Sequence, residues 1–213
     1  AGGTVRKLAN AGARIRLVLF SEGAEGYGAA AEAGTIVATR DRETRAICQI
    51  LGIQEYQNEH QLDWNLKVDN PTYHIVVRQI REFRPDLVFT HSFADYNDHQ
   101  AVHKVVVEGW FHAALECAMK DGPVWKHVPL YEYEVLQPLP EPSVVVDVTD
   151  TFDAKIEAMK QYPSQYGIVG SIFQFMEGRA LQRGYLAGTK YAEAFRRISY
   201  RPRRITDVNK LLD

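Results

Sequence analysis

The chain has 213 residues, a hydrophobic content of 46%, a charged content of 24% and a formal net charge of −2 at pH 7. These values are typical of one large globular domain or two small ones, and the near-neutral charge without long basic or acidic runs argues against a nucleic-acid or membrane-surface protein. No apolar run reaches the roughly 18–20 residues of a membrane span and no signal peptide is visible, so we expect a cytoplasmic protein.

Helical and strand-like patterns alternate along most of the chain. The expected helices are residues 4–11, 40–51, 70–84, 98–119, 151–162, 171–182 and 187–198. The expected strands are residues 14–20, a short one within 53–69, then 86–90, 130–136 and 143–148. Gly12 and Gly52 are suited to end two of the helices, and Asn70-Pro71 is suited to begin a third as N-cap and first residue. The alternation predicts a single α/β domain over residues 1–213, with a Rossmann-like parallel sheet flanked by helices and a helical C-terminal portion.

The first expected helix has no strand before it. Parallel sheets grow in strand–helix–strand units, so a strand should precede residues 4–11. We therefore expect an N-terminal strand to be missing from this sequence, and strand 86–90 to lie beside its place in the sheet.

The most informative segment is the loop from Thr90 to His99, between the expected strand 86–90 and the helix after it. Ligands of open α/β sheets bind at the carboxyl ends of the strands. This loop carries His91, Asp95, Asp98 and His99, and imidazole and carboxylate groups are the usual ligands of catalytic zinc. The alternative is a solvated helix start with Asp98 as the N-cap. Spacing alone leaves both interpretations open.

Two neighbouring features also have paired interpretations. His103 lies one helical turn after His99 and could join a metal site, but a packing or hydrogen-bonding role behind the site is favoured. Arg40 lies three residues before Glu43, and a surface ion pair is favoured over contact with a substrate oxygen.

Four glycines lack the spacing of a phosphate-binding fingerprint, so we expect a flexible substrate loop. They are Gly23, Gly26, Gly28 and Gly34.

The two cysteines and one basic cluster have simpler interpretations. Cys48 and Cys117 fall in helical patterns and are expected to be buried thiols in a reducing compartment. The cluster from Arg201 to Arg204 is expected to be a solvated tail.

The order of the motifs resembles the LmbE-like, or PIG-L, family of metal-dependent N-deacetylases. Five segments carry the resemblance: Gly2-Gly3-Thr4-Val5 with residues 7–12, Arg40-Asp41-Arg42-Glu43 with residues 50–53, residues 85–91 with Asp98-His99-Gln100-Ala101-Val102-His103, residues 155–165, and Tyr191-Ala192-Glu193-Ala194-Phe195. The last two resemble the C-terminal helices of the family. The family's first motif, Ala-His-Pro-Asp-Asp-Glu, is not in this sequence.

The resemblance implies a zinc-dependent hydrolase that removes an N-acetyl or other N-acyl group from a sugar or small glycoconjugate. It assigns zinc binding to His99, an orienting role to the Asp98 carboxylate, and substrate contact to Arg40. The other zinc ligands and the general base of the family belong to the motif that is absent here, so activity depends on that motif being part of the complete protein.

Tyr96 departs from the family pattern, which often has a histidine there that helps to stabilise the developing oxyanion. Tyr96 is the candidate for that role, although another residue could take it or it could be lost. His91 and Asp95, in the same loop, are candidates for substrate contact; His91 could instead bond a backbone carbonyl.

Two other functions remain as alternatives. One is a non-catalytic carbohydrate-binding or scaffold protein on the same fold. The other, a nucleotide-binding Rossmann protein, is weakened by the missing glycine fingerprint. The expected partner is a small N-acetylated sugar or glycoconjugate, without nucleic acid, and homo-oligomer formation is left open.

Overall fold

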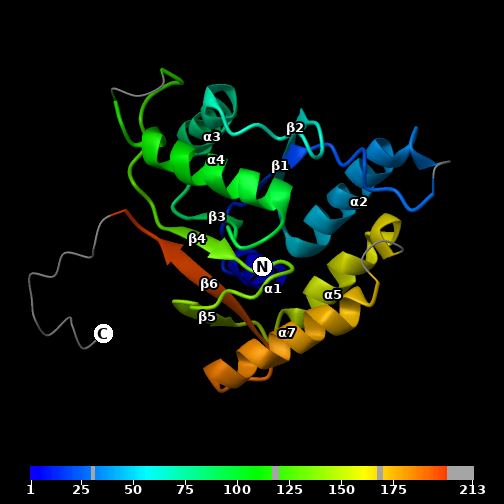
Figure 1. Cartoon of the computed structure of the whole chain (residues 1–213). Coiled ribbons are helices and arrows are strands. Elements are labelled where there is room, and N and C mark those ends of the chain that lie inside the picture. Colours follow the sequence, from blue (N-terminus) through cyan, green and yellow to red (C-terminus); the bar gives the residue numbers. More distant parts are fainter. Residues whose placement is uncertain (30–31, 117–119, 167–169, 201–213) are drawn as a thin grey trace, which may run out of the picture.

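The computed structural model describes residues 1–29, 32–116, 120–166 and 170–200, and helices alternate with strands through most of it (Figure 1). The first half holds α1 (Gly2–Asn10), β1 (Arg16–Ser21), α2 (Ile36–Leu51), β2 (Glu55–Gln61), α3 (Asn70–Phe83), β3 (Val88–His91) and α4 (Asn97–Ala113). The second half holds β4 (Leu130–Tyr133), β5 (Val144–Asp147), α5 (Phe152–Lys160), the short 3-10 helix η2 (Pro163–Gln165), α7 (Ile172–Ala187) and β6 (Ala192–Ile198). The predicted α/β class is confirmed. Cys48 is a buried free thiol as expected, whereas Cys117 and the cluster 201–204 lie outside the described residues.

The strands form two sheets. β1 pairs in parallel with β2, and a second sheet has the order β3-β4-β6-β5. β3 and β4 are parallel, but β6 is antiparallel to both of its neighbours, so the larger sheet is mixed rather than purely parallel. β3 is an edge strand of the larger sheet and does not pair with β1 in the described structure. The expected strand beside β3 would lie outside this sequence, so that expectation stays a prediction.

The expected helix over residues 187–198 is wrong, because Ala192–Ile198 forms the interior strand β6. Residues 192–195 are all buried, so the strand lacks the alternation of a half-buried strand. Alanine and glutamate favour helices in isolation, but pairing with β4 on one side and β5 on the other overrides that preference. The C-terminal portion is therefore a helix, α7, followed by a strand.

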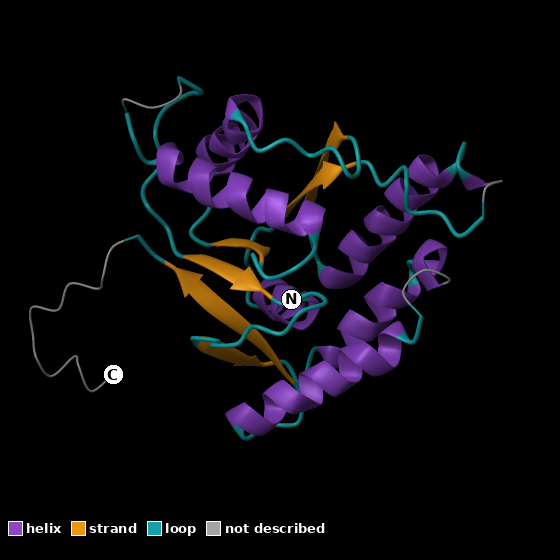
Figure 2. Ribbon diagram, in the orientation of Figure 1, coloured by secondary structure: helices purple, strands orange, loops and turns teal. Residues whose placement is uncertain are grey.

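One hydrophobic core joins the two sheets. Helices α3 and α4 pack together on one side of the strands, whereas α5 and α7 lie on the other side (Figures 1 and 2). The core under α3 and α4 includes Phe20 of β1, Ile80 of α3, Val105 of α4 and Leu130 of β4. Gly109 lets the two helices approach closely, because a Cβ atom there would lie 2.5 Å from the Cβ of Val76. No described helix has the length and apolar character needed to cross a membrane.

Most helix ends follow the expected chemistry. Gly12 and Gly52 have φ angles of 87° and 75°, the left-handed conformation that glycine adopts without strain. The N-cap of α3 is Asp69 rather than the predicted Asn70, and its carboxylate accepts a hydrogen bond of 3.2 Å from the backbone N–H of Thr72. Helix α2 begins at Ile36, so Arg40 lies in its second turn and not at its first residue.

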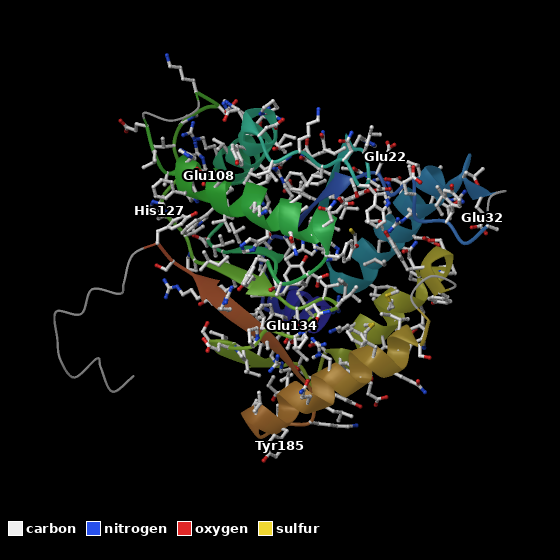
Figure 3. All side chains as sticks on the ribbon, in the orientation of Figure 1. Glu22, Glu32, Glu108, His127, Glu134 and Tyr185 are labelled. Carbon is white, nitrogen blue, oxygen red and sulfur yellow. The ribbon has the colours of Figure 1, made fainter. Side chains whose placement is uncertain are left out.

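Two buried carboxylates tie the C-terminal elements to the rest of the fold. Glu193 of β6 accepts hydrogen bonds from the backbone N–H groups of Gly3 (3.2 Å) and Thr4 (2.8 Å), which satisfies orphan donors at the start of α1. Glu134, just after β4, pairs with Arg183 of α7. Figure 3 shows Glu134 in the interior, near the sheet and α7. These contacts fix α1 and α7 to the larger sheet.

Candidate active site

The candidate site lies in the loop between β3 and α4, at the carboxyl end of β3. The strand ends at His91 and the helix begins at Asn97. The N-cap of α4 is Tyr96, and Asp98 lies in the first turn, so the interpretation of Asp98 as the N-cap is wrong. The Asp98 carboxylate instead accepts a hydrogen bond of 2.9 Å from the backbone N–H of Trp64. Asp98 therefore joins this loop to the segment after β2.

His99 is held by a carboxylate and by two rings. Its Nδ1 lies 3.2 Å from Oδ1 of Asp95, and its ring centroid lies 4.1 Å from those of both His91 and Tyr96. Burial lowers the pKa of His99, and the negative charge of Asp95 opposes this only in part. The imidazole is therefore neutral at pH 7. The buried Nδ1 faces Asp95 without making a hydrogen bond of regular geometry, and Nε2 lies on the other side of the ring.

Asp95 is fixed from several sides. It is buried, its Oδ1 accepts a hydrogen bond from the N–H of Tyr96, and its Oδ2 accepts one from the N–H of Leu136, each at 2.9 Å. The carboxylate nearest to Nδ1 of His99 is thus Asp95, whereas Asp98 binds the N–H of Trp64; the orienting role expected of Asp98 stays a prediction. Because both oxygens of Asp95 are engaged inside the protein, the geometry argues against the expected substrate contact of Asp95.

His91 lies behind the site rather than at its surface. β3 and β4 pair in parallel with His91 opposite Tyr133, and the Tyr133 hydroxyl lies 3.2 Å from Nε2 of His91. Burial, and then the neighbouring histidines, hold the pKa of His91 well below its usual range. A neutral His91 that stacks on His99 supports that ring, and this position argues against substrate contact by His91.

The supporting role expected for His103 is confirmed. Its Nδ1 donates a hydrogen bond of 2.9 Å to the backbone carbonyl of His91 and lies 3.5 Å from a carboxylate oxygen of Glu132. Glu132 is fully buried on β4 and also pairs with Arg196 of β6. His103 therefore fixes the end of β3, one layer behind His99.

Tyr96 combines exposure with a raised pKa. Its side chain is 45% exposed. Partial burial and the charges of Asp95 and Asp98 raise the pKa of its phenol, against the opposing charge of Arg40. The hydroxyl is therefore protonated at neutral pH and can donate a hydrogen bond to a ligand oxygen.

Arg40 lies against the glycine-rich loop that follows β1; Glu22, labelled in Figure 3, lies where this loop begins. Nη1 of Arg40 donates a hydrogen bond of 3.2 Å to the carbonyl oxygen of Gly23. A Cβ atom at Gly23 would lie 2.6 Å from that nitrogen, and one at Gly26 would also collide with it. Two of the glycines thus make room for the guanidinium group. The positive charge of Arg40 opposes the rise in the pKa of the Tyr96 phenol.

Glu43 does not form the expected surface ion pair with Arg40. It is buried, and its two oxygens accept hydrogen bonds from the backbone N–H (3.1 Å) and the hydroxyl (2.6 Å) of Ser164. Over the residues that the structure describes, no ion pair joins Arg40 to Glu43. Arg40 is therefore free of the carboxylate that the ion-pair interpretation assigned to it.

The described residues do not complete a metal site. No group of three or more His, Cys, Asp or Glu side chains among them is placed to hold a metal ion. His99 presents Nε2, both oxygens of Asp95 are engaged with backbone amides, and His91 contacts Tyr133 through Nε2 while its buried Nδ1 has no hydrogen-bond partner among the described residues. A catalytic zinc ion ordinarily takes three protein ligands, so these residues fit one ligand of such a site and not the whole site.

Sequence reasoning missed three residues of this region: Glu132, Tyr133 and Trp64. Tyr133 ends a strand parallel to β3, and the rule that singled out His91 could have found it. Glu132 is a buried charge in a strand, which the sequence marks only weakly. Trp64 lies in a polar connection that carries no periodic pattern.

Comparisons with known proteins agree with the fold. The family described as "PIG-L: GlcNAc-PI de-N-acetylase" matches residues 1–110. The N,N'-diacetylchitobiose deacetylase of Pyrococcus horikoshii has a TM-score of 0.85 at 22% identity, covering 97% of this chain and 82% of that one. A conserved protein of Thermus thermophilus has a TM-score of 0.82 at 24% identity, covering 96% and 90%. The 4-carboxy-2-hydroxymuconate hydratase of Pseudomonas putida has a TM-score of 0.80 at 22% identity, covering 97% and 93%.

The structural similarities are below 25% identity and show a shared fold, on which both a deacetylase and a hydratase occur. The family match is more specific, because it spans more than half of the chain and includes α2, β3 and the His99 loop. This protein belongs to the PIG-L, or LmbE-like, deacetylase family.

Proposed function

We propose that this protein is a zinc-dependent hydrolase that removes an N-acetyl group from a sugar or small glycoconjugate. The observation that carries the proposal is the position of the His99 ring, with its Nδ1 3.2 Å from the buried Asp95 carboxylate and its ring centroid 4.1 Å from that of Tyr96. Family membership supports the reaction class. The deacetylase from Pyrococcus horikoshii, which has the same fold, acts on an acetylated disaccharide.

Each residue has a separate part in this proposal. His99 is the proposed zinc ligand, and its partner ligands would come from outside the described residues. Asp95 keeps the His99 ring in one orientation, as carboxylates behind metal-binding histidines commonly do. Asp98 fixes the wall of the site through its hydrogen bond from Trp64.

Tyr96 and Arg40 are the proposed substrate contacts. As an amide is attacked, negative charge develops on its carbonyl oxygen, and a fixed O–H donor stabilises that charge. The phenol of Tyr96 can supply this hydrogen bond because its pKa is raised. The guanidinium of Arg40, which lies against the glycine-rich loop, would hold a sugar oxygen and orient the acetamido group.

A second candidate is a carbohydrate-binding protein without turnover. The incomplete set of metal ligands among the described residues favours it. In both cases the partner is a small acetylated sugar or glycoconjugate. A cytoplasmic location and self-association stay predictions.

Product analysis separates the two candidates. The protein expressed from its complete gene is incubated with N-acetylglucosamine and with diacetylchitobiose, and acetate and free amine are both measured. The deacetylase proposal predicts equal amounts of the two products, and a loss of about 100-fold in kcat for Tyr96→Phe. Sugar binding in a calorimeter without release of acetate would establish the second candidate instead.

A further inference from the structure

Asp63, in the connection between β2 and α3, contacts the glycine-rich loop that follows β1. Its Oδ1 accepts a hydrogen bond of 3.2 Å from the backbone N–H of Gly23, and its Oδ2 accepts one of 2.8 Å from the N–H of Glu25. β1 and β2 are parallel neighbours, so the carboxylate bridges the two chain segments that leave the same edge of this small sheet.

The peptide groups of Gly23 link Asp63 to Arg40. The N–H of Gly23 donates to Asp63, whereas its carbonyl oxygen accepts from Nη1 of Arg40. Gly23 has a φ angle of 76°, a conformation that lets glycine direct these two groups to different partners without strain. Farther along the loop, the carbonyl oxygen of Gly26 accepts a hydrogen bond of 3.2 Å from Gln165. Moving Asp63 would therefore release the loop on the side that faces Arg40.

The residue after Asp63 joins the same assembly to the helix that carries His99. Trp64 has a φ angle of 61°, which is unusual for a bulky residue, and its N–H donates to Asp98. Asp63 and Arg40 also act with opposite charge on the phenol of Tyr96. Residues 63 and 64 thus connect the loop that holds Arg40 to the start of α4.

We infer that Asp63 is a positioning residue, which fixes the glycine-rich loop so that Arg40 faces the substrate beside His99. The inference rests on the proposed function, since it concerns the substrate contact assigned to Arg40. Asp63 acts through hydrogen bonds to two backbone amides. It does not itself contact the substrate.

A double-mutant cycle tests the inference through KM for diacetylchitobiose. Asp63→Ala and Arg40→Ala are each expected to raise KM about tenfold with little change in kcat, and the double variant is expected to be no worse than Arg40→Ala alone. Asp63→Asn keeps one acceptor oxygen and is expected to give an intermediate KM. Asp41→Ala is the matched control, because this acidic residue on α2 pairs with Arg45 on the surface and should leave KM unchanged. Independent effects of Asp63 and Arg40 that multiply in the double variant would overturn the inference.

Hydrogen exchange tests the positioning role without any assay of activity. In Asp63→Ala the amides of Gly23 and Glu25 are expected to exchange faster, while the amides of α3 keep their protection. Unchanged exchange at Gly23 and Glu25 would overturn the inference. An inactive wild-type protein would refute the proposed function. The exchange experiment would still show whether Asp63 fixes the glycine-rich loop.

Discussion

Nδ1 of His99 lies 3.2 Å from Oδ1 of Asp95, four residues earlier and just before α4 begins. Asp95 cannot turn away easily, because backbone amides of Tyr96 and Leu136 bind both of its oxygens. The relationship places Nδ1 of His99 beside a buried carboxylate and leaves Nε2 on the other side of the ring. It also separates the roles of two carboxylates that are three residues apart.

Replacing Asp95 by Asn should reduce turnover while keeping the shape of the side chain. Loss of the charged acceptor leaves the His99 ring free to adopt a second orientation, and such changes typically cost 10–100-fold in activity or metal affinity. The measurement is kcat for diacetylchitobiose, with circular dichroism to verify the fold. Asp41→Asn provides the control. Wild-type turnover in Asp95→Asn would show that this carboxylate does not orient His99.

Gly26→Ala should weaken substrate binding through Arg40. The added methyl group would collide with the guanidinium, and the flexible side chain would move away from its present position. We expect KM to rise nearly as much as in Arg40→Ala, with the thermal midpoint changed by only a few degrees. Gly28→Ala is the matched control, since its nearest neighbour would lie 4.0 Å from the new Cβ. Equal KM values for the two glycine variants would contradict the arrangement of this loop.

The ionised carboxylate of Glu193 should make the free energy of unfolding depend on pH in the acidic range. The pKa of Glu193 is held well below its usual range: burial raises it, whereas the positive charge of Lys155 and hydrogen bonds from Lys155 and the N–H of Thr4 are among the effects that lower it. A carboxylate with a depressed folded pKa stabilises the protein above its unfolded pKa, near 4.5, and this contribution is lost as the pH falls below that value.

The comparison uses the free energy of unfolding of the wild type and of Glu193→Gln, from urea titrations at several pH values. At pH 7 the variant should be less stable by about 3 kcal/mol, because Lys155 loses its buried partner. The difference should shrink as the pH drops below 4.5. Glu157→Gln, in an exposed pair with Lys160, should change stability by less than about 0.5 kcal/mol. If the difference in the free energy of unfolding between the wild type and Glu193→Gln did not change with pH, the charge of Glu193 would not be the source of the stabilisation.

Two glycines in helices should respond to alanine with opposite signs. Gly109→Ala would place a methyl group 2.5 Å from the Cβ of Val76, where α4 packs on α3, and should destabilise the protein by about 1–3 kcal/mol. Gly178 of α7 has nothing within 4 Å of the added Cβ. Gly178→Ala should therefore stabilise the protein by about 0.5–1 kcal/mol, because alanine loses less backbone entropy than glycine when the helix forms. Denaturant midpoints measure both changes. A stabilising Gly109→Ala would contradict the close approach of α3 and α4.

The sequence predicted those parts of the fold that depend on local signals. Helical spacing of apolar residues identified α2, α3 and α4, and Gly12 and Gly52 follow their helices in the left-handed conformation. β6 could not be predicted in this way, because its residues are buried through pairing with strands far away in the sequence. Local propensity in that segment favours a helix and is overridden.

The candidate site was predicted by position more than by role. The carboxyl end of β3 and the start of α4 were expected to hold His91, His99 and Asp98, and they do. That Asp95 rather than Asp98 contacts the His99 ring depends on where α4 begins, which sequence determines only to within a few residues. The link from Trp64 to Asp98 could not be predicted, since a backbone donor carries no signature in the residue type.

Zinc content tests the central claim, the assignment of His99 as a metal ligand of a deacetylase, most directly. The protein from its complete gene, His99→Ala and the control His112→Ala are purified in parallel, and zinc per chain is measured together with acetate release. His112 is a suitable control because its ring pairs with Glu108 on the far part of α4. The account predicts about one zinc per chain and activity in the wild type and the control, with both lost in His99→Ala. Equal zinc content in His99→Ala and the wild type would contradict it.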